Sequence, residues 1–239
     1  FLLYCKITLS FSPYFVKEGS ENMSNSIGQH FTPWSLLKFA APSIIMMTFM
    51  SLYTIVDGIF ISRFVGSNAL SSLNIVFPVI TLAIAIGTMF STGGNAVISK
   101  YLGEGNTKRA CQCLTQFVLF CVSLSIILVV LSILFASPIS RFLGATDILI
   151  DDAVIYLRIV MAFAPACILQ TLFQSYFVTA GHPGMGLGLM IVAGCTNAAL
   201  DYIFIAVMHM GIAGAALATG IGQCIPAVAG IVFFLFTKK

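Results

Sequence analysis

Two acidic residues lie inside long apolar runs of this sequence, and they are the leading candidates for chemistry. Asp57 and Asp201 are the only acids so placed, because the other six of the eight Asp and Glu residues fall in tails or polar breaks. If the runs cross a bilayer, an Asp near the centre costs at least about 2.5 kcal/mol, so it usually faces the protein interior and has a function. Asn197 precedes Asp201 by four residues, which on a helix places amide and carboxylate on one face.

Buried carboxylates of this kind support two interpretations. A pair that shares a site can take up a proton, or it can bind a cation through oxygen ligands. In a purely structural role, Asn and Thr neighbours would instead satisfy the carboxylates and the acids would pin helices together. The residues alone leave both open, and we develop the coupling-cation hypothesis, with H⁺ or Na⁺ as the ion, because it makes the sharper predictions.

The composition predicts an integral membrane protein. The 239 residues are 59% hydrophobic and 8% charged, and the mean hydropathy is +1.04, whereas soluble domains are roughly 45–50% apolar and about 25% charged. The net charge is only +3 and no basic stripe stands out, which argues against a nucleic-acid partner. Seven cysteines, several inside apolar runs, form no disulfide framework, and no metal-ligand spacing is present.

Six stretches have the roughly 20 apolar residues that a membrane-spanning helix needs. The fold class expected is therefore an all-α membrane protein, a bundle of six transmembrane helices within residues 34–239. Residues 1–33 form an amino-terminal tail, and residues 1–22 are expected not to be native, because Met23 opens an ordinary start before a first span. The spans are expected at about 35–61, 69–97, 115–136, 153–179, 186–207 and 212–236.

The basic residues predict the orientation of the spans. If the amino end is cytoplasmic, Lys100, Lys108 and Arg109 fall inside, while the outer side keeps Arg63 and Arg141. We therefore expect a multi-pass protein of the plasma (inner) membrane with a cytoplasmic amino terminus.

The sequence carries no enzyme signature. It lacks a Walker A loop, a GxSxG elbow and an HExxH helix, so we expect no enzymatic activity and no cofactor. Arg158, at the start of the fourth span, is either interfacial or a substrate contact. Met46, Met47 and Met50 near Pro42 suit packing, and also an adaptable binding surface.

Several separated motifs together resemble the multidrug and toxic compound extrusion (MATE) transporters. They are Leu52-Tyr53-Thr54-Ile55-Val56-Asp57, Phe64-Val65-Gly66-Ser67-Asn68-Ala69-Leu70 and Asn197-Ala198-Ala199-Leu200-Asp201-Tyr202-Ile203-Phe204. The likeness covers about residues 34–239 and is closest to the DinF-like branch, in which a proline of the first helix lies fifteen residues before the acid. Pro42 and Asp57 have that spacing.

The resemblance implies a site and a mechanism. The branch implies an amino-lobe cation-coupling site at Asp57, Tyr156, Asn197, Asp201 and Thr219, with Pro42 as the helix bend. If Na⁺ is the ion, the ligands implied are Asp57, Asn197, Asp201 and Thr219. Members of the family are secondary antiporters that export organic cations and drugs in exchange for H⁺ or Na⁺, so the partners implied are cationic amphipathic small molecules and the lipid bilayer.

The family has twelve helices in two lobes that form an inverted V, whereas this sequence has six spans. The resemblance thus implies an amino-terminal six-helix lobe, a fragment whose partner is a missing carboxyl-terminal lobe. A six-span protein that dimerises is the other architecture. Two alternative functions are a flippase for lipid-linked precursors, which needs cationic residues in its cavity, and a non-transporting structural or sensory membrane module, which needs no interior acid pair.

Overall fold

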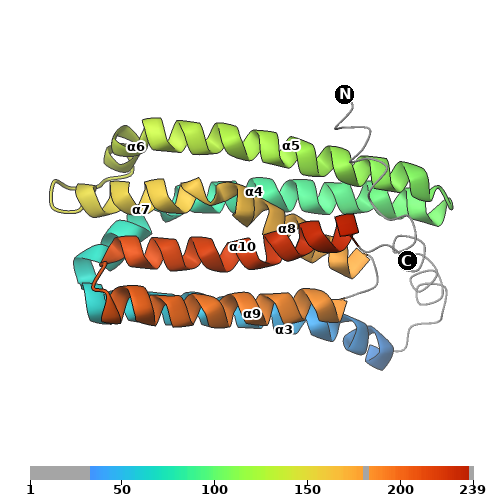
Figure 1. The fold of residues 1–239 in the computed structure, drawn as a ribbon, viewed down its shortest axis with the longest axis horizontal. Helices are drawn as coiled ribbons and strands as arrows, with labels where there is room; N and C mark the ends of the chain where they lie inside the picture. Colours follow the sequence, from blue (N-terminus) through green and yellow to red (C-terminus); the bar gives the residue numbers. More distant parts are fainter. Residues whose placement is uncertain (1–32, 180–182, 237–239) are drawn as a thin grey trace.

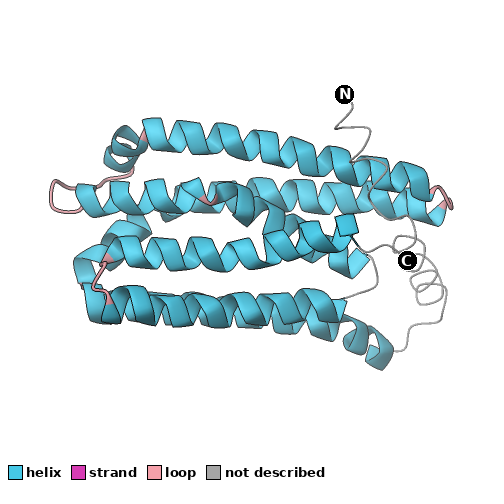
Figure 2. Ribbon diagram, viewed as in Figure 1, coloured by secondary structure: helices cyan, strands magenta, loops and turns pink. Residues whose placement is uncertain are grey.

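The computed structural model describes residues 33–179 and 183–236. The predicted tail, residues 1–33, and its non-native segment 1–22 therefore lie outside the described residues, apart from Pro33 itself. The described part consists of helices joined by short loops and turns, with no strand (Figure 2). Its elements are α3 (Pro33–Phe60), η1 (Ile61–Val65), α4 (Ser67–Gly103), α5 (Thr107–Leu134), α6 (Ala136–Phe142), α7 (Ile150–Ala162), α8 (Ala164–Thr179), α9 (Pro183–Asp201), η2 (Tyr202–Val207) and α10 (Ile212–Phe236).

The long helices run side by side along the length of the molecule, which confirms the predicted all-α bundle of membrane-spanning helices (Figure 1). Within the described residues, five helical segments are long and apolar enough to cross a membrane, and the bent pair of α7 and α8 makes a sixth. Many large apolar side chains of the spans are exposed, Ile127 of α5 and Val192 of α9 among them. So much exposed apolar surface is unfavourable in water, so these surfaces suit contact with lipid.

Two of the spans finish in π-helical segments. Segment η1 continues α3 and η2 continues α9, so the apolar stretches extend to Val65 and Val207. Gly66 follows η1 with a φ of 123° and Gly211 precedes α10 with a φ of 61°, conformations that L side chains rarely adopt. Glycines thus supply two of the turns between spans.

The fourth span is broken in the middle. Helices α7 and α8 meet at Phe163 with a bend of 51°. Pro165, in the first turn of α8, has no N–H to donate, so the helix does not continue through this point. The Phe163 ring packs against Gly220 of α10, where a Cβ atom would collide with it. A glycine on the neighbouring helix therefore makes room for the break.

Buried apolar side chains form two clusters that hold the bundle together. One surrounds Phe173 and Phe177 of α8, and the other surrounds Leu157 and Met161 of α7. Helix α9 packs between α3 and α10, while α4 packs on both α5 and α8. The second cluster includes Tyr156 of α7 together with Ile61 of η1 and Ile205 of η2, the segments that continue α3 and α9.

The close contact at the break in the fourth span gives a first prediction. Replacing Gly220 by Ala adds a methyl group against the Phe163 ring, and we expect it to lower the free energy of unfolding by about 1–3 kcal/mol, as overpacking does. Gly93→Ala is the matched control, because a Cβ atom there meets nothing within 4 Å; it should be neutral or stabilising by up to about 1 kcal/mol. Thermal denaturation of the purified protein in detergent measures both, and equal melting temperatures would contradict this packing.

Candidate functional site

The two intramembrane acids meet in the interior of the bundle. Asp57 lies near the end of α3 and is 9% exposed, while Asp201 is the last residue of α9 and is fully buried. Their carboxyl groups are within hydrogen-bonding reach of each other. Among the described residues, no donor bonds Asp57 Oδ1 or either oxygen of Asp201.

This arrangement restricts the charge that the pair can carry. A carboxyl group can hydrogen-bond another only if one of the two holds a proton, because an ionised carboxylate is solely an acceptor. Two ionised carboxylates in contact repel each other strongly where water is excluded. The pair therefore needs at least one bound proton, or a cation between its oxygens. A proton and a monovalent cation such as Na⁺ can each bind to the pair reversibly.

Two tyrosines flank the acids. Tyr156 of α7 is buried, and its phenol lies near Asp57, Asp201 and Tyr53. Tyr53 precedes Asp57 by one helical turn on α3 and also lies near it. The acids are thus bordered by hydroxyl groups rather than by basic side chains.

An amide and an aliphatic hydroxyl lie one turn further along. Asn197 is 3% exposed, and its Nδ2 donates to Thr219 Oγ1 of α10 at 3.5 Å. Gly222 makes this approach possible, because a Cβ atom there would lie 3.2 Å from the Asn197 Cβ. The structure therefore brings together all five residues predicted for the cation site. Pro42 lies within α3, fifteen residues before Asp57, and its side chain is outside the described residues.

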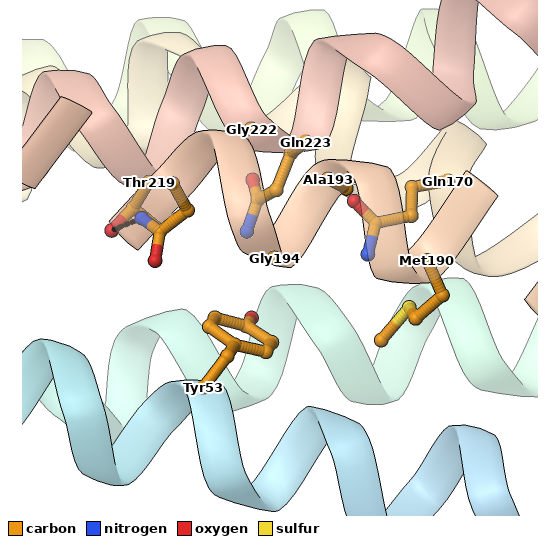
Figure 3. Close-up of a pocket in the computed structure, with 9 residues that line it drawn as sticks. Tyr53, Gln170, Met190, Ala193, Gly194, Thr219, Gly222 and Gln223 are labelled. Carbon is orange, nitrogen blue, oxygen red and sulfur yellow. Dashed lines mark hydrogen bonds between the residues drawn. The ribbon is translucent and has the colours of Figure 1, made fainter. Parts of the chain in front are cut away.

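A small cavity opens beside this cluster (Figure 3). Its volume is about 10 Å³, which is close to the lower limit for holding one water molecule. Tyr53 projects from α3 towards Gln223 of α10 and Gln170 of α8, and Thr219 lies at one end (Figure 3). The cavity is lined by Tyr53, Gln170, Met190, Ala193, Gly194, Asn197, Thr219, Gly222 and Gln223.

A much larger cavity lies between α3, α4 and α8. Its volume is about 420 Å³, within the range of pockets that bind small organic molecules. Its wall is a mixture of thioether, hydroxyl and amide groups, and it has no charged side chain among the described residues that line it. Met46, Met47 and Met50, the methionines singled out in the sequence, form its α3 side.

The chemistry of the cluster formed by the two acids, Tyr156, Asn197 and Thr219 favours a hard monovalent ion. Its donor set consists of carboxylate, phenol, hydroxyl and amide oxygens, which suit a proton or a hard cation such as Na⁺ better than a soft metal. The small cavity, whose wall includes Asn197 and Thr219 but neither acid, has room for a water-sized ion and no room for an organic molecule. The two cavities thus differ in size and in the kind of ligand that fits.

Sequence reasoning missed several polar residues of this region. The amides Gln170, Gln174 and Gln223 were not among the predicted site residues, although each interrupts an apolar run. Tyr53, one turn from Asp57, was not among them either. A count of all amides within predicted spans, rather than of charges alone, would have found the glutamines.

Comparisons with known proteins agree with this architecture. The family model described as MatE matches residues 42–203. The multidrug export protein MepA of Staphylococcus haemolyticus is 25% identical over 205 residues, which is 86% of this chain and 45% of MepA. This chain therefore spans about half the length of the curated relatives it matches.

Solved structures share the fold. A crystal structure of MATE in the bent conformation has a TM-score of 0.79 at 22% identity, covering 93% of this chain and 47% of that one. A second, in the straight conformation, has a TM-score of 0.77 at 23% identity, covering 84% and 44%. Because the family model matches more than half of the sequence, including Asp57 and Asp201, this chain belongs to the MatE family.

Proposed function

We propose that this chain is the amino-terminal half of a secondary active antiporter that exports organic cations and drugs in exchange for H⁺ or Na⁺. The observation that carries the proposal is the buried contact between Asp57 and Asp201, in which Asp57 Oδ1 and both oxygens of Asp201 lack donors from other described residues. It is supported by membership of the MatE family and by the likeness to a multidrug export protein. The coupling ion binds at the acid pair, with Tyr156, Asn197 and Thr219 completing its contacts, and the drug occupies the larger cavity.

Exchange follows because the coupling ion and the drug do not bind at the same time. When the ion binds, it neutralises the acid pair, and the first helix bends at Pro42. That bend reshapes the methionine side of the larger cavity and lowers its affinity for a cationic drug on the outer side. When the ion leaves, the negative charge attracts the next organic cation, and no cofactor takes part.

The finer assignments rest on the sequence. The fifteen-residue spacing of Pro42 and Asp57 supports the DinF-like branch. The match covers about half the length of the relatives. This supports an amino-terminal lobe, residues 34–239, that works with a second six-helix lobe. The distribution of Lys and Arg supports a cytoplasmic amino terminus in the inner membrane.

The two alternative functions are less well supported. A flippase for lipid-linked precursors needs cationic groups facing its cavity, yet Arg158 is exposed on α7 and lines neither cavity described above. A structural or sensory module has no need for two acids that touch inside the bundle. The contact between Asp57 and Asp201 therefore favours transport.

Neutralising either acid tests the proposal. We expect Asp57→Asn and Asp201→Asn each to reduce ion-driven efflux of a fluorescent cationic dye by at least about tenfold, a loss equivalent to one strong ionic contact. Asp151→Asn, an exposed acid in the first turn of α7, should export normally. Undiminished ion-dependent export by either buried-acid variant, at equal expression, would rule the site out.

The Asn197–Thr219 contact predicts a weaker effect of a different kind. Thr219→Val removes the hydroxyl that accepts from Asn197 but keeps the shape of the side chain. We expect it to raise the ion concentration needed for half-maximal efflux by about tenfold while leaving the maximal rate within about twofold. Thr219→Ser retains the hydroxyl and should behave like the unmodified protein, so an equal shift in both variants would count against a role for that oxygen.

A further inference from the structure

Three buried amide oxygens on residues that line the small cavity or the larger cavity have no donor. They are Gln223 Oε1 on α10, Gln170 Oε1 on α8 and Asn95 Oδ1 on α4, and no described residue donates a hydrogen bond to any of them. A buried carbonyl-type oxygen without a partner is unfavourable unless water or a cation satisfies it. All three are acceptors, which is the lining that a hydrated or partly dehydrated cation requires.

Gln170 connects the two cavities. It lines the small cavity beside Asn197 and Thr219, and it also lines the larger cavity between α3, α4 and α8. The residue is 7% exposed, so it belongs to a wall that the two spaces share. Gln174, one turn away on the same helix, is already engaged, because its Nε2 donates to the sulfur atoms of Met46 and Met190 at 3.5 and 3.7 Å.

Two residues of a polar row on α4 line the larger cavity. Ser67, Asn74, Thr81, Thr88 and Asn95 recur at every seventh position along this helix, a spacing that keeps them on nearly one face. The first four are exposed and Asn95 is partly buried. Polar side chains along most of a membrane-spanning helix usually face water or protein rather than lipid, and Thr88 and Asn95 line the larger cavity.

We propose that a small cation reaches the acid pair from the larger cavity by passing Gln170, whose amide oxygen is a stepping point between the two spaces. The inference rests on the proposed function, since it supplies the route of the coupling ion. It also explains why ion and drug compete, because the ion enters through the space that the drug fills. Gln170 positions the passing ion and is not one of the groups that hold it at the acid pair.

A silver-ion accessibility experiment tests the route without requiring transport. Thr219→Cys places a thiol in the small cavity, in a protein whose native cysteines are replaced by Ala, reconstituted in liposomes. Ag⁺ is a small cation that reacts with thiols, and the unreacted Cys is counted afterwards with a maleimide in denaturant. Adding Gln170→Leu should slow the reaction by at least about tenfold, the factor for losing one oxygen partner of an ion.

Two further variants separate the amide from general damage. Gln170→Asn keeps an amide oxygen and should restore the rate to within about threefold of the parent. Thr171→Val, next along α8 and lining only the larger cavity of the two, should leave the rate unchanged. A rate in Gln170→Leu equal to that of the parent, or equal slowing in Gln170→Leu and Gln170→Asn, would overturn the route.

The results distinguish a failure of the proposed route from a failure of the proposed function. Full dye export by Asp201→Asn would refute the coupling site whatever the silver rates are. Conversely, loss of export in Asp201→Asn together with an unchanged silver rate in Gln170→Leu would leave the coupling site standing and refute the route alone.

Discussion

The structure depends on one constraint, the burial of two carboxyl groups against each other in the middle of an apolar bundle. Two negative charges in contact are strongly unfavourable where the effective dielectric is low. Asp57 and Asp201 must therefore hold at least one proton or a cation. To bring them together, α3 and α9 pack closely, and at Gly194 of α9 a Cβ atom would come within 2.6 Å of the Phe49 ring of α3.

The surroundings separate the handling of small and large ligands. The space beside Asn197 and Thr219 has the size of a water molecule, whereas the space between α3, α4 and α8 is large enough for an organic molecule. Gln170 belongs to both walls. In an exchange mechanism, binding of the ion must affect binding of the drug. A wall shared by the two cavities can couple the two binding events without a long chain of intervening residues.

Much of this molecule follows from its sequence, for identifiable reasons. Long apolar runs predict the spans, and counting acids found Asp57 and Asp201 because charge is rare in such runs. Tyr156 and Thr219 needed the family resemblance, since neither is unusual in a span. The break at Phe163 could not be placed from Pro165 alone, because prolines such as Pro78 lie within an unbroken helix; the contact with Gly220 is a tertiary feature. The shared wall at Gln170 likewise depends on how the helices around it pack.

The most direct test of the account is a count of exchangeable cations on the purified protein. Binding of radioactive Na⁺, together with proton release on adding a cationic drug, should reveal an ion that the drug displaces. The same measurement on the double variant Asp57→Asn with Asp201→Asn should show that ion lost. If the double variant binds and releases the ion as the unmodified protein does, the buried carboxyl pair is not the coupling site.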